Sequence, residues 1–220
     1  MTTLRFSARA LDPLRRLYEE LSSETGCPSV DMGLKLHEVG PGFKRVQMRW
    51  YFAKSRSAIA LFRRVFDSCN LVVARSIVGT RKDRVRVVQA NLIEIKGGYP
   101  KGPWHSDFVD KALCPGDSAT ILTPLYRLEA NLGGLETTSV KRDSESLDYD
   151  GHADVYKYRE GEAVVFDALA MVHRTQSYRA RPSARRVLVS WQIADTRRHM
   201  PDVLRRIGRR NGDPMFLFPH

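Results

Sequence analysis

Two kinds of hydrophobic pattern follow one another along the chain, one with helical spacing and one typical of β-strands. Apolar residues recur at three- and four-residue steps from Leu11 to Leu21 and again from Ile59 to Phe66. This spacing predicts two amphipathic helices. Pro13 suits the first turn of the earlier one.

Short apolar runs bounded by turn residues predict strands, and from residue 85 onward they dominate the pattern. The predicted strands span 30–36, 46–52, 85–95, 118–128, 155–158, 163–166, 172–178 and 186–193. The first two flank the turn signal Gly40-Pro41-Gly42. Because no helical pattern separates the later strands, the expected fold class is mainly β with flanking α-helices, an antiparallel sandwich or barrel rather than a parallel α/β sheet.

A length of 220 residues fits one compact domain. We expect residues 1–84 to form an N-terminal support region, 85–195 the β core, and 196–220 a basic C-terminal helix and tail. Within that tail Val203, Leu204 and Ile207 have helical spacing. The segment 139–153 is polar and lacks periodicity, so it is either a hairpin tip or a lid.

The sequence also argues against several protein classes. No apolar stretch approaches the roughly 20 residues that cross a bilayer, and the N-terminus lacks the pattern of a cleaved secretion signal. Cys27, Cys69 and Cys114 are far apart and show no paired spacing, which argues against a disulfide framework and a cysteine zinc site. A cytoplasmic protein is therefore expected.

Positive charge is strongly biased toward arginine. The net charge is +11, and 27 of the 36 basic residues are arginine, a residue suited to bidentate contact with carboxylate or phosphate. Six arginines fall between Arg197 and Arg210. They form either a solvated helix face or a surface for nucleic acid, phosphate or an acidic carrier protein.

A candidate metal site begins at His105-Ser106-Asp107, which follows the glycine- and proline-rich run 97–103. Residues two apart on an extended chain point to the same side, so His105 and Asp107 can offer an imidazole and a carboxylate to one metal. His173, on a later predicted strand, is the candidate third ligand. Two histidines and one carboxylate make a facial triad with open positions, the arrangement of non-haem Fe(II) oxygenases.

A competing pair is His152 and Asp154, in and just after the polar segment. Only 21 residues separate His152 from His173, which leaves little room for the strands that would bring the two together. We therefore prefer His105 and Asp107.

The region from Val85 to Ala194 resembles the Fe(II)/2-oxoglutarate-dependent dioxygenases. The likeness rests on His105-x-Asp107, on His173, on the approach Tyr158-x-x-Gly161-Glu162-Ala163-Val164-Val165-Phe166, and on the segment Arg185–Trp191. It implies a double-stranded β-helix, or jelly roll. It also implies that Fe(II), 2-oxoglutarate and O2 are used, with release of succinate and CO2.

In that family a basic residue on the strand after the second histidine pairs with the far carboxylate of 2-oxoglutarate. Arg185 and Arg186 compete for this role. We expect Arg185, because strand alternation then puts Val187, Val189 and Trp191 with it on one inward face. Further contacts are expected from Asn91 and Tyr99 to the co-substrate, and from Trp104, Thr123, Tyr126 and Trp191 to the substrate.

The resemblance implies hydroxylation or another oxidation, because related halogenases have a small residue where Asp107 stands. The favoured substrate is a small polar or anionic molecule, such as an amino acid or a biosynthetic intermediate. The alternatives are a peptide or protein side chain, a methylated nucleic acid, and a jelly-roll binding domain without catalysis. AlkB-like demethylases carry further arginine and asparagine spacing that 185–194 does not reproduce.

Overall fold

A computed structural model describes most of the chain. The described residues are 1–23, 32–38, 47–71, 74, 84–100, 102–108, 113–114, 116–138, 152–196, 200–212 and 214–216, with the backbone alone at 37, 38, 47, 210 and 211. The predicted turn at 40–42, Cys27, nearly all of the polar segment 139–153 and the pair Arg197-Arg198 lie outside them.

Ten strands and three α-helices are defined among these residues. In chain order the elements are β1 (Thr2–Arg5), a 3-10 turn (Ala8–Leu11), α1 (Asp12–Ser23), β2 (Leu34–Glu38), β3 (Gln47–Ala53), α3 (Arg56–Ser68), β4 (Val85–Lys96), β5 (Ser118–Pro124), β6 (Leu135–Thr138), β7 (Asp154–Tyr156), β8 (Glu162–Asp167), β9 (Val172–Thr175), β10 (Arg185–Asp195) and α4 (Met200–Asn211).

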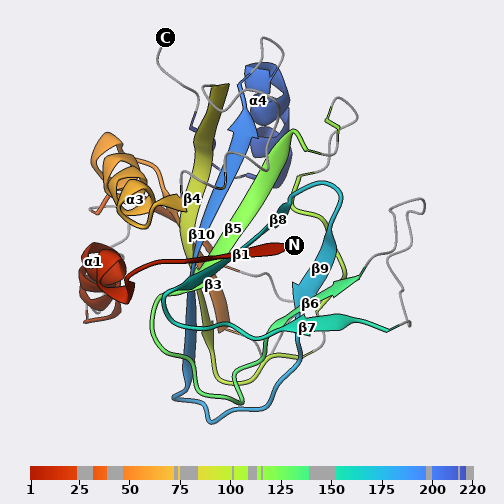
Figure 1. Cartoon of the computed structure of the whole chain (residues 1–220). Helices are drawn as coiled ribbons and strands as arrows, with labels where there is room; N and C mark the ends of the chain where they lie inside the picture. The colour runs from red at the N-terminus through yellow and green to blue at the C-terminus, as the bar shows by residue number, and fades with distance from the viewer. Residues whose placement is uncertain are drawn as a thin grey trace.

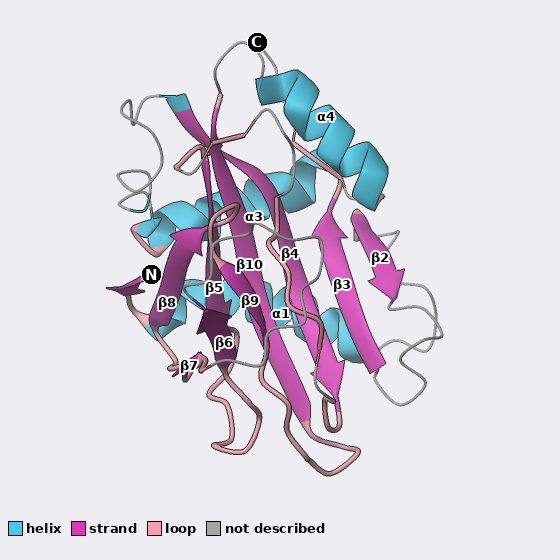
Figure 2. Ribbon diagram, turned by 90° about the vertical axis from the view of Figure 1, so that its right-hand side faces the viewer, coloured by secondary structure: helices cyan, strands magenta, loops and turns pink. Residues whose placement is uncertain are grey.

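The strands form two antiparallel sheets that face each other. The larger has seven strands in the order β1-β8-β5-β10-β4-β3-β2, and the smaller has three in the order β7-β6-β9. After β4 the chain passes repeatedly between them, and in Figure 2 the small sheet lies in front of the large one, with α1 and α3 behind. This is a double-stranded β-helix, so the expected mainly β fold class is confirmed.

Helices α1 and α3 cover the outer face of the large sheet (Figure 1). Helix α3 begins after Ser55, whose side chain accepts a hydrogen bond from the backbone N–H of Ala58, as a good N-cap does. The helices bury Leu14, Tyr18 and Phe62, among others, in one cluster with the outward residues of β10. None of the described helices is long and apolar enough to span a membrane.

Strand boundaries differ from the predicted ones where the chain turns early. The strand predicted at 118–128 ends at Pro124, and one further backbone bond to β10, from the N–H of Leu125 to the carbonyl of Val187, follows it. The strand predicted at 172–178 ends at Thr175. Strand β1, which pairs with β8, was not predicted because four largely exposed residues carry no alternation.

Candidate metal centre

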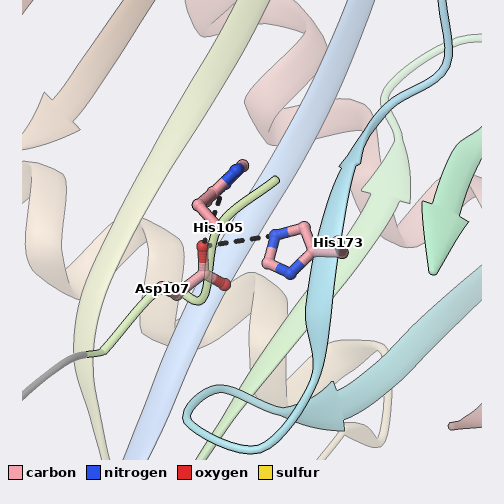
Figure 3. Close-up of side chains that lie close together, drawn as sticks. All are labelled: His105, Asp107 and His173. Atoms are coloured by element: carbon pink, nitrogen blue, oxygen red, sulfur yellow. Dashed lines mark ion pairs between the residues drawn. The ribbon is translucent and has the colours of Figure 1, made fainter. Parts of the chain in front are cut away.

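The segment that carries His105 extends the small sheet by one backbone pair. The N–H of His105 donates to the carbonyl of His173 over 3.0 Å, and the N–H of His173 donates to the carbonyl of His105 over 2.9 Å. This pairing brings together two segments that are 68 residues apart in the sequence. Asp107, two residues after His105, lies on the same side of its segment (Figure 3).

The side chains of His105, Asp107 and His173 converge on one point. Nε2 of His173 lies 3.4 Å from Oδ1 of Asp107, and Nε2 of His105 lies 3.8 Å from the same oxygen. One ligand atom from each residue falls within 4.8 Å of the other two. Among the described residues these three are the group of histidine, cysteine and acidic side chains with spacing that suits a metal ion, and His152 and Asp154 are not part of it.

Backbone carbonyls orient both imidazoles. Nδ1 of His105 lies 3.1 Å from the carbonyl oxygen of Pro103, and Nδ1 of His173 lies 3.2 Å from that of Met171. Because a carbonyl oxygen only accepts, these contacts favour the neutral form that carries its hydrogen on Nδ1 and its lone pair on Nε2. Both lone pairs are therefore available to one cation.

The charges at this point are set by burial and by mutual contact. Burial alone would raise the pKa of Asp107, but His173, His105 and the Thr120 hydroxyl outweigh it and lower that pKa to about 2. Burial lowers the pKa of His173, and the Asp107 carboxylate more than reverses this, so the pKa is raised. Burial and the neighbouring His173 lower the pKa of His105. The carboxylate is thus ionised at neutral pH, as a metal ligand must be.

A cavity of about 470 Å³ opens between the two sheets beside this triad. Residues of the large sheet line it with alternate side chains of β3, β4, β5 and β10. The small sheet contributes Leu135, His173 and Thr175, and the connecting segments contribute Tyr99 and Tyr158 among others. The triad and the cavity therefore form one site.

Arg186, and not Arg185, faces this cavity. Arg186 is only 1% exposed and lines the cavity with Leu188, Ser190 and Gln192 of the same strand. The side chain of Arg185 is 45% exposed on the helix-covered face, where Nη1 lies 4.0 Å from Oε1 of Glu94. The expectation that Arg185 faces inward is wrong. Both faces of β10 are buried, so the more apolar face packs under the helices and the mixed face lines the site.

Arg186 has buried donors without partners. Its Nε and Nη2 are buried and make no hydrogen bond in the structure, and its guanidinium lies 5.1 Å from the centre of the Tyr158 ring. The hydroxyl of Tyr178 is likewise buried and unpaired, and the buried Tyr158 lies beside the Arg186 guanidinium. The charge of Arg186 acts on both rings and on Tyr99, opposing the rise in pKa that burial causes in these tyrosines. This is a set of donors that suits an anion.

Of the other residues predicted to contact the co-substrate or the substrate, some line the cavity and some lie elsewhere. Asn91 and Tyr99 line the cavity. Trp104 does not, and its ring packs against the guanidinium of Arg174 at 4.1 Å. The remaining three, Thr123, Tyr126 and Trp191, which the sequence led us to expect at the substrate, are not among the residues that line the cavity.

Each of these three has a partner on the helix-covered side or in the strand ladder. The Trp191 ring N–H donates to the carbonyl of Phe62, and the Thr123 hydroxyl donates to the carbonyl of Glu162. Tyr126 packs edge-on against Tyr18 of α1. Their roles in this structure are those of packing residues.

Sequence reasoning missed the cavity residues Thr120, Tyr158 and Gln192. A signal was present on β10, where buried positions 186, 190 and 192 alternate with the apolar 187, 189 and 191. Polar residues recurring with a period of two on one face, opposite an apolar face, indicate a strand that lines a site on its polar side.

Comparison with known proteins shows a likeness in structure alone. No protein-family model matches the chain, and no curated protein matches it. Solved structures do match. The epimerase SnoN, solved with Fe3+, alpha ketoglutarate and nogalamycin RO, aligns with a TM-score of 0.60 at 13% identity, over 88% of this chain and 78% of SnoN.

Two further structures match over similar lengths. A prolyl-4-hydroxylase from Pseudomonas putida has a TM-score of 0.53 at 14% identity, over 88% of this chain and 91% of its own. HygX from Streptomyces hygroscopicus, solved with nickel and 2-oxoglutarate, has a TM-score of 0.55 at 14% identity, over 89% and 82%. The chain thus has the double-stranded β-helix fold of these three proteins, and two of them, SnoN and HygX, were solved with a metal and 2-oxoglutarate.

Proposed function

We propose that the protein is an Fe(II)- and 2-oxoglutarate-dependent oxygenase that oxidises a small molecule and releases succinate and CO2. The observation that carries the proposal is that a His-Asp-His triad and a buried arginine with unpaired donors line the same cavity. A structural jelly roll needs neither feature. An unpaired buried guanidinium is costly unless a ligand pairs with it.

The triad fits a divalent iron. Nε2 of His105, Nε2 of His173 and Oδ1 of Asp107 are the three donors, and a facial set of two nitrogens and one oxygen is typical of non-haem Fe(II) sites. Bound there, iron with 2-oxoglutarate supplies the oxidising chemistry of the reaction. The protein's part is to hold the three donors, orient the substrate and exclude water.

The far end of the cavity fits the co-substrate. Nε and Nη2 form the side-on edge of a guanidinium, which binds a carboxylate through two parallel hydrogen bonds. In Arg186 these two atoms are the unpaired ones. The hydroxyl of Tyr158, on a ring next to Arg186, is placed to donate a further hydrogen bond. Arg186 therefore takes the role that the sequence assigned to Arg185.

Small-molecule substrates are favoured over peptides and nucleic acids. The cavity lies between the two sheets, and its 470 Å³ matches the size of ordinary small-molecule sites. SnoN was solved with nogalamycin RO and HygX with hygromycin B. The matching prolyl hydroxylases, one in complex with a peptide fragment, make oxidation of a peptide side chain the second candidate.

A cytoplasmic location remains our proposal. Cys69 is buried and Cys114 exposed, and both are free thiols, which suits a reducing compartment.

The test is anaerobic addition of Fe(II) and 2-oxoglutarate to the purified protein. We expect the weak visible charge-transfer band of the chelate, at one equivalent of each. The His173→Ala variant should show no band and should keep the circular dichroism of the folded protein. Absence of a band in the wild-type protein, or an undiminished band in His173→Ala, would refute the assignment.

A further inference from the structure

A group of uncharged polar side chains lines the cavity near the triad. Three carboxamides, Gln89, Asn91 and Gln192, line the cavity and are 3%, 4% and 8% exposed. We call them the amide cluster. Oδ1 of Asn91 and Oε1 of Gln192 are buried and have no hydrogen-bond partner.

Strand register places the amide cluster next to the metal ligands. Gln192 of β10 pairs with Gln89 of β4 on one side and with Thr120 of β5 on the other. The hydroxyl of Thr120 in turn donates to Asp107. The amide cluster and the triad are therefore neighbours.

The anion-binding end lies away from this cluster. Arg186 and Gln192 are six residues apart on the same strand, roughly 20 Å along an extended backbone. Arg186 is the one lysine or arginine among the described residues that line the cavity. With Arg186 engaged by 2-oxoglutarate, the described residues of this lining offer no second lysine or arginine to an anionic substrate.

An apolar stripe on β3 begins next to the amide cluster and runs toward the level of Arg186. Met48, Trp50 and Phe52 line the cavity on alternate positions of that strand, and Phe52 pairs in register with Asn91. Aromatic faces pack well against apolar ring surfaces. Phe52 thus places one aromatic ring beside the uncharged amides, while Trp50 pairs in register with Ile93 and Met48 with Ile95, which lies opposite Arg186.

We infer that the substrate is a neutral, hydroxyl-bearing ring compound, such as a cyclic polyol or a glycoside, rather than a carboxylate, a phosphate or an amine. This rests on the proposed function. A carboxamide offers one acceptor and two donors, so it matches a hydroxyl group, which both donates and accepts. Among the described residues of the lining Asp107 is the one acidic side chain and Arg186 the one lysine or arginine. With Asp107 bound to the metal and Arg186 to 2-oxoglutarate, a charged substrate would find no free opposite charge among them, and burial of an unpaired charge is strongly unfavourable.

From the sequence we expected a polar or anionic substrate. The lining of the cavity favours polar molecules without charge. The arginine-rich composition had suggested an anion, but α4 lies outside the cavity lining. Arg186, the one arginine among the described residues of the lining, binds the co-substrate in our proposal.

The test uses three matched probes on the protein loaded anaerobically with Fe(II) and saturating 2-oxoglutarate. They are phenyl β-D-glucopyranoside, phenyl β-D-glucuronide and phenyl 2-amino-2-deoxy-β-D-glucopyranoside, which share a ring and differ in charge. Binding is measured by saturation-transfer NMR titration. We expect the neutral glucoside to bind about tenfold or more tightly than either charged analogue, which corresponds to at least about 1.4 kcal/mol.

Two variants give opposite expected results. Gln192→Met replaces the amide by an apolar group of similar length, and should weaken glucoside binding about tenfold while the 2-oxoglutarate band persists. Arg186→Met should instead remove the band. The wild-type probe comparison stands without the variants if either fails to fold.

Equal or tighter binding of the glucuronide in the presence of 2-oxoglutarate would overturn the inference, and so would failure of all three probes to bind. The visible band separates these results from a failure of the proposed function. If the band forms and the glucoside does not bind, the substrate class is wrong and the oxygenase assignment stands. If no band forms, the oxygenase assignment itself is wrong.

Discussion

Thr120 of β5 donates its hydroxyl hydrogen to Oδ2 of Asp107, while Oδ1 of the same carboxylate faces both histidine Nε2 atoms. One oxygen is thereby held by the protein and the other is left for the metal. Such a partner restricts rotation of the carboxylate and keeps it in the orientation that completes the triad.

Thr120→Val should therefore weaken Fe(II) affinity without removing a ligand. Valine has nearly the same shape and lacks the hydroxyl, and loss of a partner of this kind typically costs about 10- to 100-fold in metal affinity. The measurement is an anaerobic competition titration against a chelator of known affinity.

Thr123→Val is the matched control, because Thr123 lies on the same strand with its hydroxyl bonded to the carbonyl of Glu162. It should lower the free energy of unfolding by about 1 kcal/mol and leave iron affinity unchanged. Equal iron affinities in the two variants would contradict the role of Thr120.

Arg185 and Arg186 provide a second test, since they are adjacent in the sequence and lie on opposite faces of β10. Arg186→Met should raise the dissociation constant for 2-oxoglutarate at least about 100-fold, because it removes a charge-assisted pair in a buried place. Arg185→Met should change that constant less than about threefold. The measurement is a titration of the visible band with 2-oxoglutarate, and the reverse ranking would return the role to Arg185.

Glu94 of β4 links α1 to the large sheet through a hydrogen bond with Tyr18. Its side chain is only 3% exposed, Tyr18 donates to Oε1 over 2.6 Å, and Tyr51 donates to Oε2 over 3.2 Å. Glu94→Gln exchanges one of the two acceptors for a donor, so the free energy of unfolding should fall by about 1–3 kcal/mol. Urea unfolding measures this change.

The 2-oxoglutarate band of the folded Glu94→Gln variant should match that of the wild type, since Glu94 faces the helices and not the cavity. A lost band with unchanged unfolding would place Glu94 in the site instead.

The fold and the positions of the three candidate ligands could be anticipated from the chain, because both depend on local patterns. Short strands with turn residues between them predict an antiparallel β fold, and the His105-x-Asp107 spacing predicts two side chains on one side of a segment. The inward face of β10 could not be assigned in this way. Alternation tells which residues share a face, but helices cover one face and a cavity the other, and both bury their residues.

The same uncertainty about which face of a strand lines the cavity applies to two of the expected substrate contacts. Trp191 and Thr123 are on strands that border the site, and an aromatic or hydroxyl side chain on such a strand is a reasonable candidate. Helix α3, including Phe66, packs against one face of the sheet and so determines which side chains of β5 and β10 it covers. This packing depends on contacts between residues distant in the sequence.

Helix α4 allows the small-molecule and nucleic-acid hypotheses to be separated. Val203, Leu204 and Ile207 are buried together with Phe108, next to Asp107, so the helix packs on the domain as its spacing predicted. Arg205, Arg206 and Arg209 are exposed, and Arg205 pairs with Asp202 one turn earlier. The arginines therefore lie away from the packed side.

Charge reversal of Arg205, Arg206 and Arg209 to glutamate should leave turnover of a small substrate, or uncoupled succinate formation, within about threefold of the wild type. Binding of the wild-type protein to generic DNA or RNA should be no tighter than non-specific, on the order of 10⁻⁴ to 10⁻⁶ M at physiological salt, and should weaken steeply as salt rises. Fluorescence anisotropy with labelled oligonucleotides measures it. Nanomolar, lesion-selective binding that disappears in the reversed variant would instead favour a nucleic-acid demethylase, because salt-resistant selectivity requires contacts to bases that a solvated arginine face does not make.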